Sequence, residues 1–437
     1  MKSVSAPVRA IAVALWVWGG TVAAFAQTTS APYPPLGFVF VQDIIPDITL
    51  DIRYAGSHNF AGTQIDGYDA PLAILRAEAA AALKAVNASL RKKELGLKIF
   101  DAYRPEQAVQ HFVRWAENLS DTRMKSQFYP EVDKSMLFQE GYIARRSGHS
   151  RGNTVDLTLI SLKTGQELDM GSPFDFFGKI SHHGAEGITP AQAANRATLR
   201  EAMEAHGFKR IKEEWWHYTL KEEPAPAFAN FPIQNPAPAS PAVQSTLEKA
   251  AQGAARVILV TDGLGTDSKN NRAVLSAWSK NEGIWTHRFS TAGWLGKTGF
   301  RQNKREGDGA TPTGIFTFGR AFGNAENPGT PLPYTKVSKN DVWVDDPQSK
   351  FYNQWAHSDA PDADWSSAER LSDYAKQYEY AVSVNYNTAP ILPGKGSAIF
   401  LHVATGRPTA GCIAVPRAAM IFFLGFIEKD TKIVLGE

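Results

Sequence analysis

Two histidines and an aspartate in this sequence have the types and spacing of a catalytic metal site. His149 precedes a glycine-containing turn, Asp156 lies on the β-rich segment after it, and His217 follows two tryptophans further along the chain. Two imidazoles and one carboxylate leave a tetrahedral zinc ion with one open position for water. Zinc lowers the pKa of that water toward about 7, and a nearby carboxylate then accepts its proton, with Glu214 as the candidate base. Each residue has an ordinary alternative, because a lone histidine is usually a core or surface residue and an aspartate near a turn is often a cap.

The spacing of Glu214 and His217 adds a structural requirement. Residues three apart on a straight strand point to opposite faces of a sheet. The two side chains can share a site only if the chain bends between them. We therefore expect Glu214 in a loop just before a strand, or a bulge at the two tryptophans.

A second group of residues near the C-terminus could carry nucleophilic chemistry. His402 lies on an apolar segment, and a Gly/Pro-containing loop leads from it to Gly411 and Cys412. An imidazole that removes the thiol proton would leave a nucleophilic thiolate, and Gly411 would let the backbone approach closely. The alternative is that Cys412 is a small buried core residue, as free cysteines often are.

Several elements must position the first group. The Ala-rich, periodic segment 72–91 predicts a helix, and segment 191–206 predicts another. Segments 97–100, 154–160 and 215–220 are expected to be strands, and Pro105 favours an extended Arg104 at the tip of the first. Helices and strands mixed without βαβ regularity predict an α+β fold.

The second half of the chain has a different sequence pattern. Short apolar runs punctuated by glycine and proline predict a mostly β fold. A Pro/Ala/Gln-rich stretch before it can form neither a continuous helix nor a central strand. We expect a first domain over residues 27–232, a linker over 233–253 and a second domain over 254–437. The expected strands of the second domain are 257–261, 315–318, 342–344, 380–386, 398–403 and 432–435.

Composition and termini limit the function classes. The chain has 437 residues, 43% hydrophobic and 21% charged, with a net charge of +2 and no clustered basic run, so a nucleic-acid partner is not expected. A basic N-terminus, an apolar run over 10–24 and a small-x-small site predict a signal peptide over 1–26. An uncleaved anchor is the alternative, but the run is short for a membrane span. We expect an exported protein of the periplasm or cell envelope, with no stable membrane span in the mature chain.

Residues 34–233 resemble the zinc D-alanyl-D-alanine dipeptidases, including those of vancomycin resistance. The resemblance rests on Ser-x-His-Ser-Arg-Gly-x-x-x-Asp-Leu-Thr-Leu at 147–159, Glu-Trp-Trp-His-Tyr at 214–218 and Asp-Ala-Tyr-Arg-Pro at 101–105. It implies one Zn²⁺ per chain held by His149, Asp156 and His217, with Glu214 as the catalytic base. It also implies that Arg104 stabilises the oxyanion, which suits a guanidinium that is always charged and donates twice. Asp175 would pair with the free ammonium of the dipeptide, and Ser147 would contact the substrate.

Residues 255–437 resemble the L,D-transpeptidase catalytic domain. The shared features are His402, Thr-x-Gly-Cys-Ile at 409–413 and the loop Glu-Gly-Asp-Gly-Ala-Thr-Pro-Thr-Gly at 306–314. The resemblance implies that Cys412 is the nucleophile and His402 its base. The chain departs from many members at Ala410 and Ala414, and its histidine-to-cysteine spacing is shorter. These departures leave open whether an amine or water resolves the acyl-enzyme.

Together the two resemblances predict an exported cell-wall enzyme of two catalytic domains. Its expected partners are the D-Ala-D-Ala dipeptide and peptidoglycan stem peptides. Four alternatives remain: the second domain is a hydrolase, the second domain is an inactive wall-binding module, the zinc domain is a D,D-carboxypeptidase on stem peptides, or the role is purely structural. A structural role would give Glu214 and Arg104 no reason to accompany three metal ligands.

Overall fold

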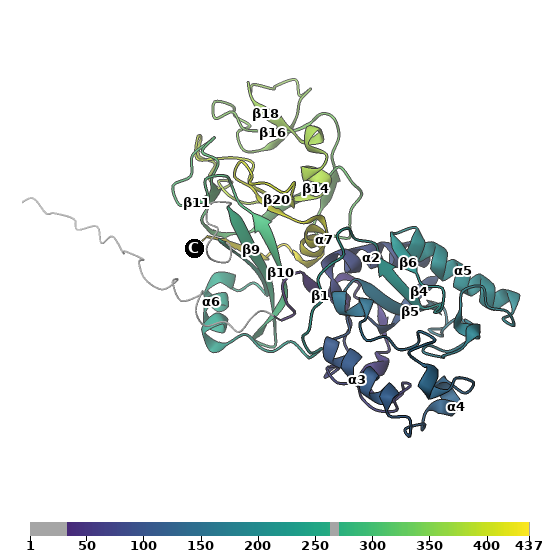
Figure 1. Cartoon of the computed structure of the whole chain (residues 1–437). Helices are drawn as coiled ribbons and strands as arrows, with labels where there is room; N and C mark the ends of the chain where they lie inside the picture. Colours follow the sequence, from purple (N-terminus) through teal and green to yellow (C-terminus); the bar gives the residue numbers. More distant parts are fainter. Residues whose placement is uncertain (1–32, 263–270, 437) are drawn as a thin grey trace, which may run out of the picture.

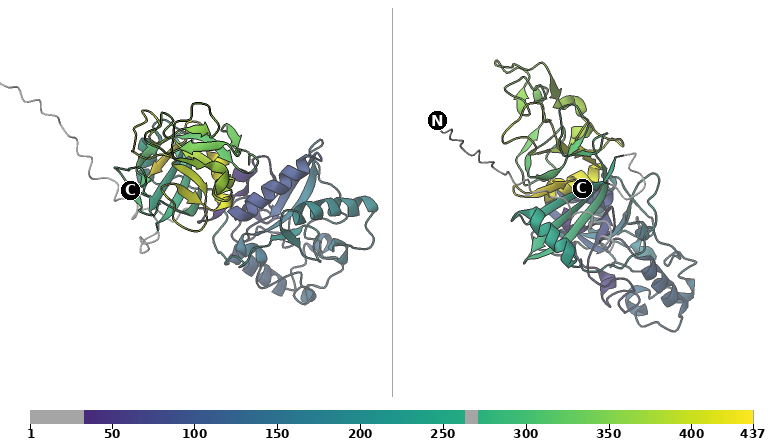
Figure 2. Two further views of the ribbon diagram at one scale, coloured as in Figure 1. Left: turned by 90° about the horizontal axis from the view of Figure 1, so that it is seen from above. Right: turned by 90° about the vertical axis from the view of Figure 1, so that its left-hand side faces the viewer.

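The computed structural model describes residues 33–262 and 271–436 of the chain. The predicted signal peptide lies outside the described residues. The described chain forms two lobes joined side by side (Figure 1), and the left view of Figure 2 also separates them. Within these residues, no helix combines the length and the apolar character needed to cross a membrane.

The first lobe is a mixed α/β domain around one sheet. Its strands are β2 (Thr49–Leu50), β4 (Leu95–Asp101), β5 (Thr154–Ser161), β6 (Phe208–Arg210) and β7 (His217–Leu220). They lie in the order β2-β4-β5-β7-β6, and every pair except β2 and β4 is antiparallel. The three predicted strands of this lobe therefore correspond to β4, β5 and β7, and the α+β fold class is confirmed.

Helices cover this sheet and fix its loops. The longest are α2 (Ala77–Arg91), α3 (Glu106–Glu117) and α5 (Pro190–Glu204), and α1 (Val41–Ile44) and α4 (Lys125–Phe128) are single turns. Helix α5 begins with a capping box in which Thr189 and Gln192 satisfy each other's backbone amides, and Pro190 occupies its first turn.

The prediction of a helix from residue 72 was wrong at its start. Residues Ile74–Arg76 form a strand, β3, and the helix begins only at Ala77. The backbone of β3 is used for pairing with β1 (Phe38–Phe40), and Ile74 and Leu75 are fully buried there. Pairing with a strand outside the segment has overridden the local helical periodicity.

The second lobe is mostly β and forms a curled sheet. Its strands are β8 (Arg256–Asp262), β9 (Arg272–Asn281), β10 (Ile284–Trp294), β11 (Phe300–Arg301), β12 (Thr311–Pro312), β13 (Gly314–Phe316), β14 (Phe318–Gly323), β15 (Tyr334–Lys336), β16 (Asp341–Val344), β17 (Trp355–His357), β18 (Ala368–Arg370), β19 (Ala381–Val384), β20 (Phe400–Val403), β21 (Ile413–Val415) and β22 (Lys432–Leu435). The main path runs β13-β22-β8-β9-β10-β21-β20-β19-β14-β15, while β17, β16 and β18 form a small separate sheet. Three of the six predicted strands, 257–261, 342–344 and 432–435, are present throughout and the other three in part, but the sequence does not predict the long hairpin β9–β10.

Two helices accompany this sheet. Helix α6 (Pro241–Ala251) lies within the segment expected to be a linker and packs against β8, β10 and β22. Ser240 caps its N-terminus through the backbone amide of Val243, and proline occupies its first position. Helix α7 (Arg417–Phe426) is nearly all apolar and follows β21 directly.

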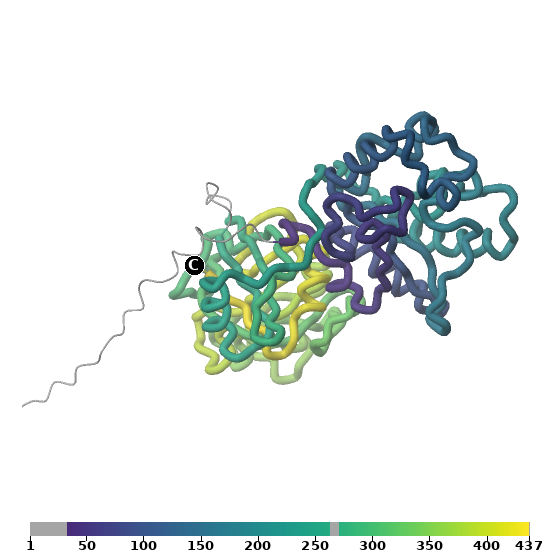
Figure 3. Tube along the Cα trace, turned by 90° about the horizontal axis from the view of Figure 1, so that it is seen from below, coloured from purple at the N-terminus to yellow at the C-terminus, as the bar shows by residue number. Residues whose placement is uncertain are grey.

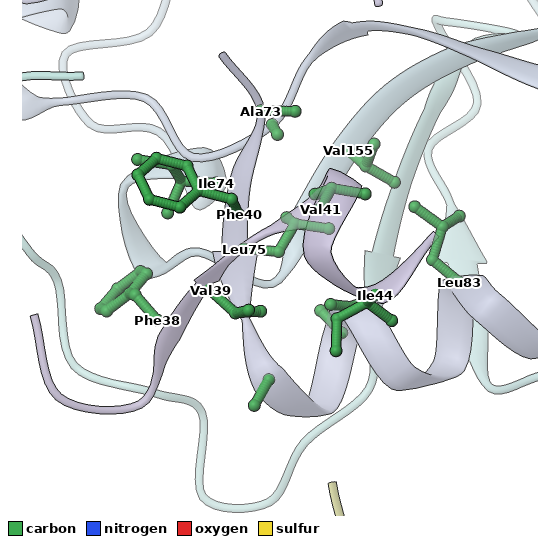
Figure 4. Close-up of a cluster of buried hydrophobic side chains, with 14 of the residues drawn as sticks. Phe38, Val39, Phe40, Val41, Ile44, Ala73, Ile74, Leu75, Leu83 and Val155 are labelled. Carbon is green, nitrogen blue, oxygen red and sulfur yellow. The ribbon is translucent and has the colours of Figure 1, made fainter. Parts of the chain in front are cut away.

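Strand β1 joins the two lobes. It pairs with β3 of the first lobe on one edge and with β10 of the second on the other, and Val39 lies opposite both Leu75 and Phe289. Figure 4 shows the apolar side chains gathered around it, and Figure 3 shows this N-terminal segment running between the lobes. Helix α2 also packs against α7 across the junction. The lobes therefore share one continuous hydrophobic core.

Candidate metal centre and cysteine site

Three elements bring the predicted metal ligands together. His149 lies in the 3₁₀ turn Gly148–Arg151. Ser147 is the N-cap of this turn and accepts a hydrogen bond from the His149 amide, and Gly152 ends the turn in the left-handed conformation. Asp156 lies on β5, and His217, the first residue of β7, is its direct cross-strand partner. The antiparallel register thus places two of the three ligands side by side, and the turn supplies the third.

The ligand atoms lie around one point. Asp156 Oδ1 lies 3.1 Å from His217 Nδ1 and 3.3 Å from His149 Nε2, and the two histidine nitrogens are 3.2 Å apart. Asp156 is 2% exposed, and its Oδ1 has no hydrogen-bond partner by geometry among the described residues. Leaving a buried carboxylate oxygen unpaired is costly, whereas a cation at this point would satisfy all three groups. The donor set of two imidazoles and one carboxylate therefore fits zinc.

Neighbouring groups fix the protonation of these ligands. His149 Nδ1 lies 2.7 Å from the carbonyl of Ala102, so it donates there and leaves Nε2 free as a ligand. Burial alone would raise the pKa of Asp156, but the imidazoles of His149 and His217 hold that pKa below its usual value. A carboxylate that stays ionised is the form that a metal requires.

Glu214 lies in the predicted place, in the loop before β7. Its Oε2 is 3.4 Å from His217 Nδ1, so the required bend is present. The two tryptophans after it make the bend: Trp215 donates from Nε1 to Ser172 Oγ at 2.9 Å, and the Trp216 carbonyl accepts from the Leu157 amide at 3.2 Å. Burial raises the pKa of Glu214 to about 7, and a neighbouring divalent cation would lower it.

Arg104 is held beside the ligands and is not a surface salt bridge. Its guanidinium donates to Asp101 Oδ2 from Nε at 2.9 Å, with Nη2 2.8 Å from the same oxygen. Nη2 also lies 3.6 Å from Asp156 Oδ2. The guanidinium rests over the rings of Tyr54 and Phe112, at 5.2 and 5.0 Å from the ring centroids. A cation fixed in this way can meet a developing negative charge without reorganising.

Asp175 forms the inner end of the same cavity. It is buried, adopts a left-handed backbone conformation with φ of 61°, and its Oδ2 accepts from the Tyr54 hydroxyl at 2.9 Å. Burial raises the pKa of Asp175 well above its usual value, with the Asp156 charge adding to the effect. A cationic group brought beside it would reverse that shift and be bound strongly.

The cavity has a volume of about 180 Å³. All of the predicted metal, base, oxyanion and substrate residues of this lobe line it, together with other residues, three of which carry polar groups and were assigned no role from the sequence. Those three are Tyr54, Tyr142 and Arg146. Tyr54 stands within the Asp-Ile-Arg-Tyr motif of residues 51–54, but its partner Asp175 is 121 positions away, so only the fold connects them.

The second predicted site lies where β20 and β21 run parallel. The register pairs Leu401 with Ile413, which sets Cys412 beside Phe400 and on the face of the sheet that His402 shares. Cys412 Sγ donates to the carbonyl of Ala398 at 3.2 Å and accepts from the Phe400 amide at 3.3 Å. The partner of His402 Nδ1 is also a backbone group, the Val403 carbonyl at 2.9 Å. The strand register thus places the thiol and the imidazole on one face of the sheet, and each group forms hydrogen bonds with the backbone.

The surroundings of Cys412 are mostly apolar. Its side chain packs against a cluster that includes Trp343, Tyr378 and Phe400, and the Tyr378 ring lies 5.5 Å from the His402 ring. Burial raises the pKa of Cys412 to about 12 and lowers the pKa of His402 to about 4. The imidazole is therefore neutral and able to take a proton, while the thiol keeps its own.

Gly411 is required by the close approach of another loop. Its φ is 153°, and a Cβ placed on it would lie 3.0 Å from the carbonyl oxygen of Ala310. Ala310 belongs to the loop 306–314 that the sequence pattern singled out. The backbone around Cys412 is thus set by that loop, as the glycine in the motif predicts.

Comparisons with known proteins agree with both resemblances. Residues 35–235 match the D-ala-D-ala dipeptidase family, and residues 258–435 match the L,D-transpeptidase catalytic domain. The D-alanyl-D-alanine dipeptidase of Enterococcus faecalis is 41% identical over 198 residues, which is 45% of this chain and 98% of that protein. The corresponding enzyme of Streptomyces coelicolor is 44% identical over 197 residues, again 45% of this chain and 98% of that protein.

Among solved structures, a vancomycin resistance D,D-pentapeptidase VanY mutant in complex with Zn(II) is similar over 36% of this chain and 77% of its own. The sequence identity is 15% and the TM-score 0.22, which is too low to indicate a shared architecture.

Proposed function

The chain belongs to the D-alanyl-D-alanine dipeptidase family through residues 35–235 and carries an L,D-transpeptidase catalytic domain over residues 258–435, and from this we propose that its first lobe hydrolyses the D-Ala-D-Ala dipeptide with one zinc ion. The most direct support is the position of Asp156 Oδ1. This oxygen is buried close to two imidazole nitrogens, and it has no hydrogen-bond partner within the described chain.

The residues around that point have different roles in peptide hydrolysis. Bound by His149, Asp156 and His217, zinc would supply a water of lowered pKa and polarise the scissile carbonyl. Glu214 takes the proton of the attacking water at a carboxylate oxygen and later returns it to the leaving amine. Arg104 donates to the oxyanion from a guanidinium already held by Asp101.

Asp175 favours a free dipeptide over a longer peptide. A buried carboxylate binds an ammonium group, and only a substrate with a free amino end at this position offers one. In a peptidoglycan stem peptide the same nitrogen is acylated and neutral. The D,D-carboxypeptidase alternative would bring no ammonium group to Asp175.

Chelation and a substrate pair test the proposal together. The wild-type protein is assayed on D-Ala-D-Ala and on its N-acetyl derivative, before and after treatment with a zinc chelator and after zinc is added back. We expect hydrolysis of the free dipeptide that is lost with the chelator and restored by zinc. Chelator-insensitive hydrolysis would contradict the metal site, and preference for the acetylated peptide would favour the carboxypeptidase alternative.

For the second lobe we propose cysteine-dependent transpeptidation of peptidoglycan stem peptides. His402 takes the thiol proton, the sulfur attacks a peptide carbonyl, and the leaving amine carries the proton away. An acceptor amine then attacks the thioester carbonyl and breaks its bond to sulfur, and the proton that the amine loses returns to the sulfur through His402; water takes the place of the amine in the hydrolase alternative. Because the pKa of the resting thiol is about 12, the thiol is protonated at rest and needs His402 to take its proton.

Acylation by a carbapenem tests this second activity. We expect the intact mass of the wild-type protein to increase by one adduct and that of Cys412→Ser to stay unchanged. An unmodified wild-type protein under prolonged exposure would favour the wall-binding alternative, since binding alone needs no nucleophile. Analysis of stem-peptide products with and without an added amine separates transfer from hydrolysis.

We also propose that the protein is exported and acts in cell-wall remodelling in the periplasm or cell envelope. The N-terminal sequence pattern and the wall-derived substrates of both families support this. Fractionation of cells that express the full chain, with N-terminal sequencing of the mature protein, tests it. A cytosolic protein that retains residues 1–26 would contradict it.

A further inference from the structure

A free dipeptide carries two charges, and Asp175 accounts for only one of them. Its ammonium end fits the buried carboxylate at the inner end of the cavity. Its carboxylate end must leave water as well, and an unpaired carboxylate in a cavity is costly. The cavity should therefore contain a cationic partner for it.

Arg104 is one of two arginines in the cavity lining, and it is already engaged. Two of its nitrogens lie within 3 Å of Asp101 Oδ2, and its side chain is 13% exposed. Its Nη2 also lies near Asp156, one of the metal ligands. This position suits the reacting carbonyl and not the far end of the substrate.

Arg146 is the other arginine, and it stands at the mouth. Its side chain lines the cavity and is exposed. The ion pairs of the described chain tie the preceding Arg145 to Glu117, but they include none for Arg146. An arginine without a carboxylate partner at the open end of the cavity is free to bind one from a ligand.

The guanidinium of Arg146 is nevertheless held in place. It lies 4.2 Å from the centroid of the Phe228 ring, and Arg151 lies 3.8 Å from the same ring. Phe228 belongs to a segment tied to the ligand turn: Ala229 donates to the Ser150 carbonyl at 2.8 Å, and Arg151 donates to the Pro226 carbonyl. The second cation on the same ring adds positive potential where an anion would bind.

Ser147 adds a donor next to Arg146. Its Oγ accepts from the His149 amide at 3.2 Å, so its own O–H remains available to donate, and the residue lines the same cavity. A hydroxyl and a guanidinium together match the two oxygens of a carboxylate.

We infer that Arg146, assisted by Ser147 and held by Phe228, binds the C-terminal carboxylate of the dipeptide. The cavity then recognises both ends of its substrate, with Asp175 at the inner end and Arg146 at the mouth. This assignment rests on the proposed dipeptidase function and adds a specificity-determining residue to it.

A substrate that lacks the carboxylate charge tests the inference. The values of kcat and KM are measured for D-Ala-D-Ala and for its C-terminal amide with the wild-type protein and with Arg146→Ala, both loaded with zinc. We expect the substitution to lower kcat/KM for the free acid roughly 10- to 100-fold, mainly through KM, because one charged hydrogen bond is lost. The value for the amide should change less than about twofold, since it has no carboxylate to lose.

Two further variants serve as controls. Arg145→Ala removes the neighbouring exposed arginine, which does not line the cavity, and should leave both substrates unchanged. Phe228→Leu keeps the charge of Arg146 but removes the aromatic ring that holds it. This variant should lower kcat/KM for the free acid, as Arg146→Ala does, but by a smaller factor.

The outcomes separate the inference from the function on which it rests. If Arg146→Ala lowers kcat/KM equally for the acid and the amide, or for neither, the role of Arg146 is overturned. The proposed dipeptidase function would stand in either case. Failure of the zinc-loaded wild-type protein to hydrolyse D-Ala-D-Ala would remove the proposed function and this inference with it.

Discussion

The two candidate centres of this molecule are built in opposite ways. Around Asp156 and Glu214, buried ionisable groups face one another in a cavity, and each charge has a partner or a place for one. Around Cys412, most neighbours are aromatic and aliphatic side chains, the charges of Glu369 and Lys304 have smaller effects than burial, and the hydrogen bonds of the sulfur go to backbone groups. The first centre is organised for charge before any substrate arrives. The second keeps its thiol protonated and its imidazole neutral at rest.

Removing the base should have the largest effect on the charged centre. We expect Glu214→Gln to lower kcat for D-Ala-D-Ala roughly 10²- to 10⁴-fold, because general-base catalysis contributes about that much. Zinc content, measured by atomic absorption, should be unchanged, since Glu214 is not one of the ligands. The exposed neighbour Glu213 provides the matched control, and Glu213→Gln should retain wild-type kcat. Retained kcat in Glu214→Gln would contradict the assigned base.

The neutral centre should be visible in the reactivity of its thiol. Because the pKa of Cys412 is raised to about 12, its thiolate at pH 8 should be on the order of 10³-fold scarcer than that of an ordinary cysteine. Alkylation by iodoacetamide, followed by intact mass, should be slow at pH 8 and rise steadily up to pH 10 without a plateau. Cys412 is the one cysteine of the chain, so every adduct reports on it. Rapid alkylation near pH 7 would show that the thiol is activated at rest and would abolish the contrast.

The oxyanion role of Arg104 should give a smaller loss than removal of the base. Arg104→Lys keeps the positive charge but loses the planar fork that bonds to Asp101 and the reacting oxygen at once. We expect kcat to fall about 10²-fold with little change in KM. A rise in KM at constant kcat would instead indicate a substrate-binding role.

The smallest expected effect concerns the junction that joins the two centres. Asp43 accepts hydrogen bonds from Arg288 across the lobes, and the carboxylate is largely buried. Asp43→Asn should lower the melting temperature by about 2–4 °C, as expected for a loss of about 1 kcal/mol. Because the lobes share a core, a single transition should move as a whole in calorimetry. Two separate transitions, one of them unchanged, would show that the centres lie in independent units.

Much of the first centre could be predicted from the sequence, because its motifs are local. The turn around His149, the strand of Asp156 and the bend before His217 each follow from residues within a few positions. The contacts of Asp175 with Tyr54 and of Arg146 with Phe228 could not be predicted, since they join residues distant in sequence.

The missed elements of the second lobe have physical reasons as well. Strands β9 and β10 carry serine, lysine, threonine and arginine on their exposed faces, which weakens a prediction based on apolar runs. Helix α6 follows several prolines, but Ser240 and Pro241 are themselves a helix-start signal. The prolines around these two residues favour a linker, so the sequence does not predict the helix.

The position of β1 also bears on the order in which the chain can fold. Residues 38–40 are made early and can pair at once with β3, which lies only about 35 residues further along. The other edge of β1 pairs with β10, and residues 284–294 emerge much later. Until then the strand presents unpaired backbone groups and apolar side chains, the features that promote wrong association between chains. A newly made chain therefore has to be protected at this edge until most of its length is available, and truncation between the lobes would leave the edge open permanently.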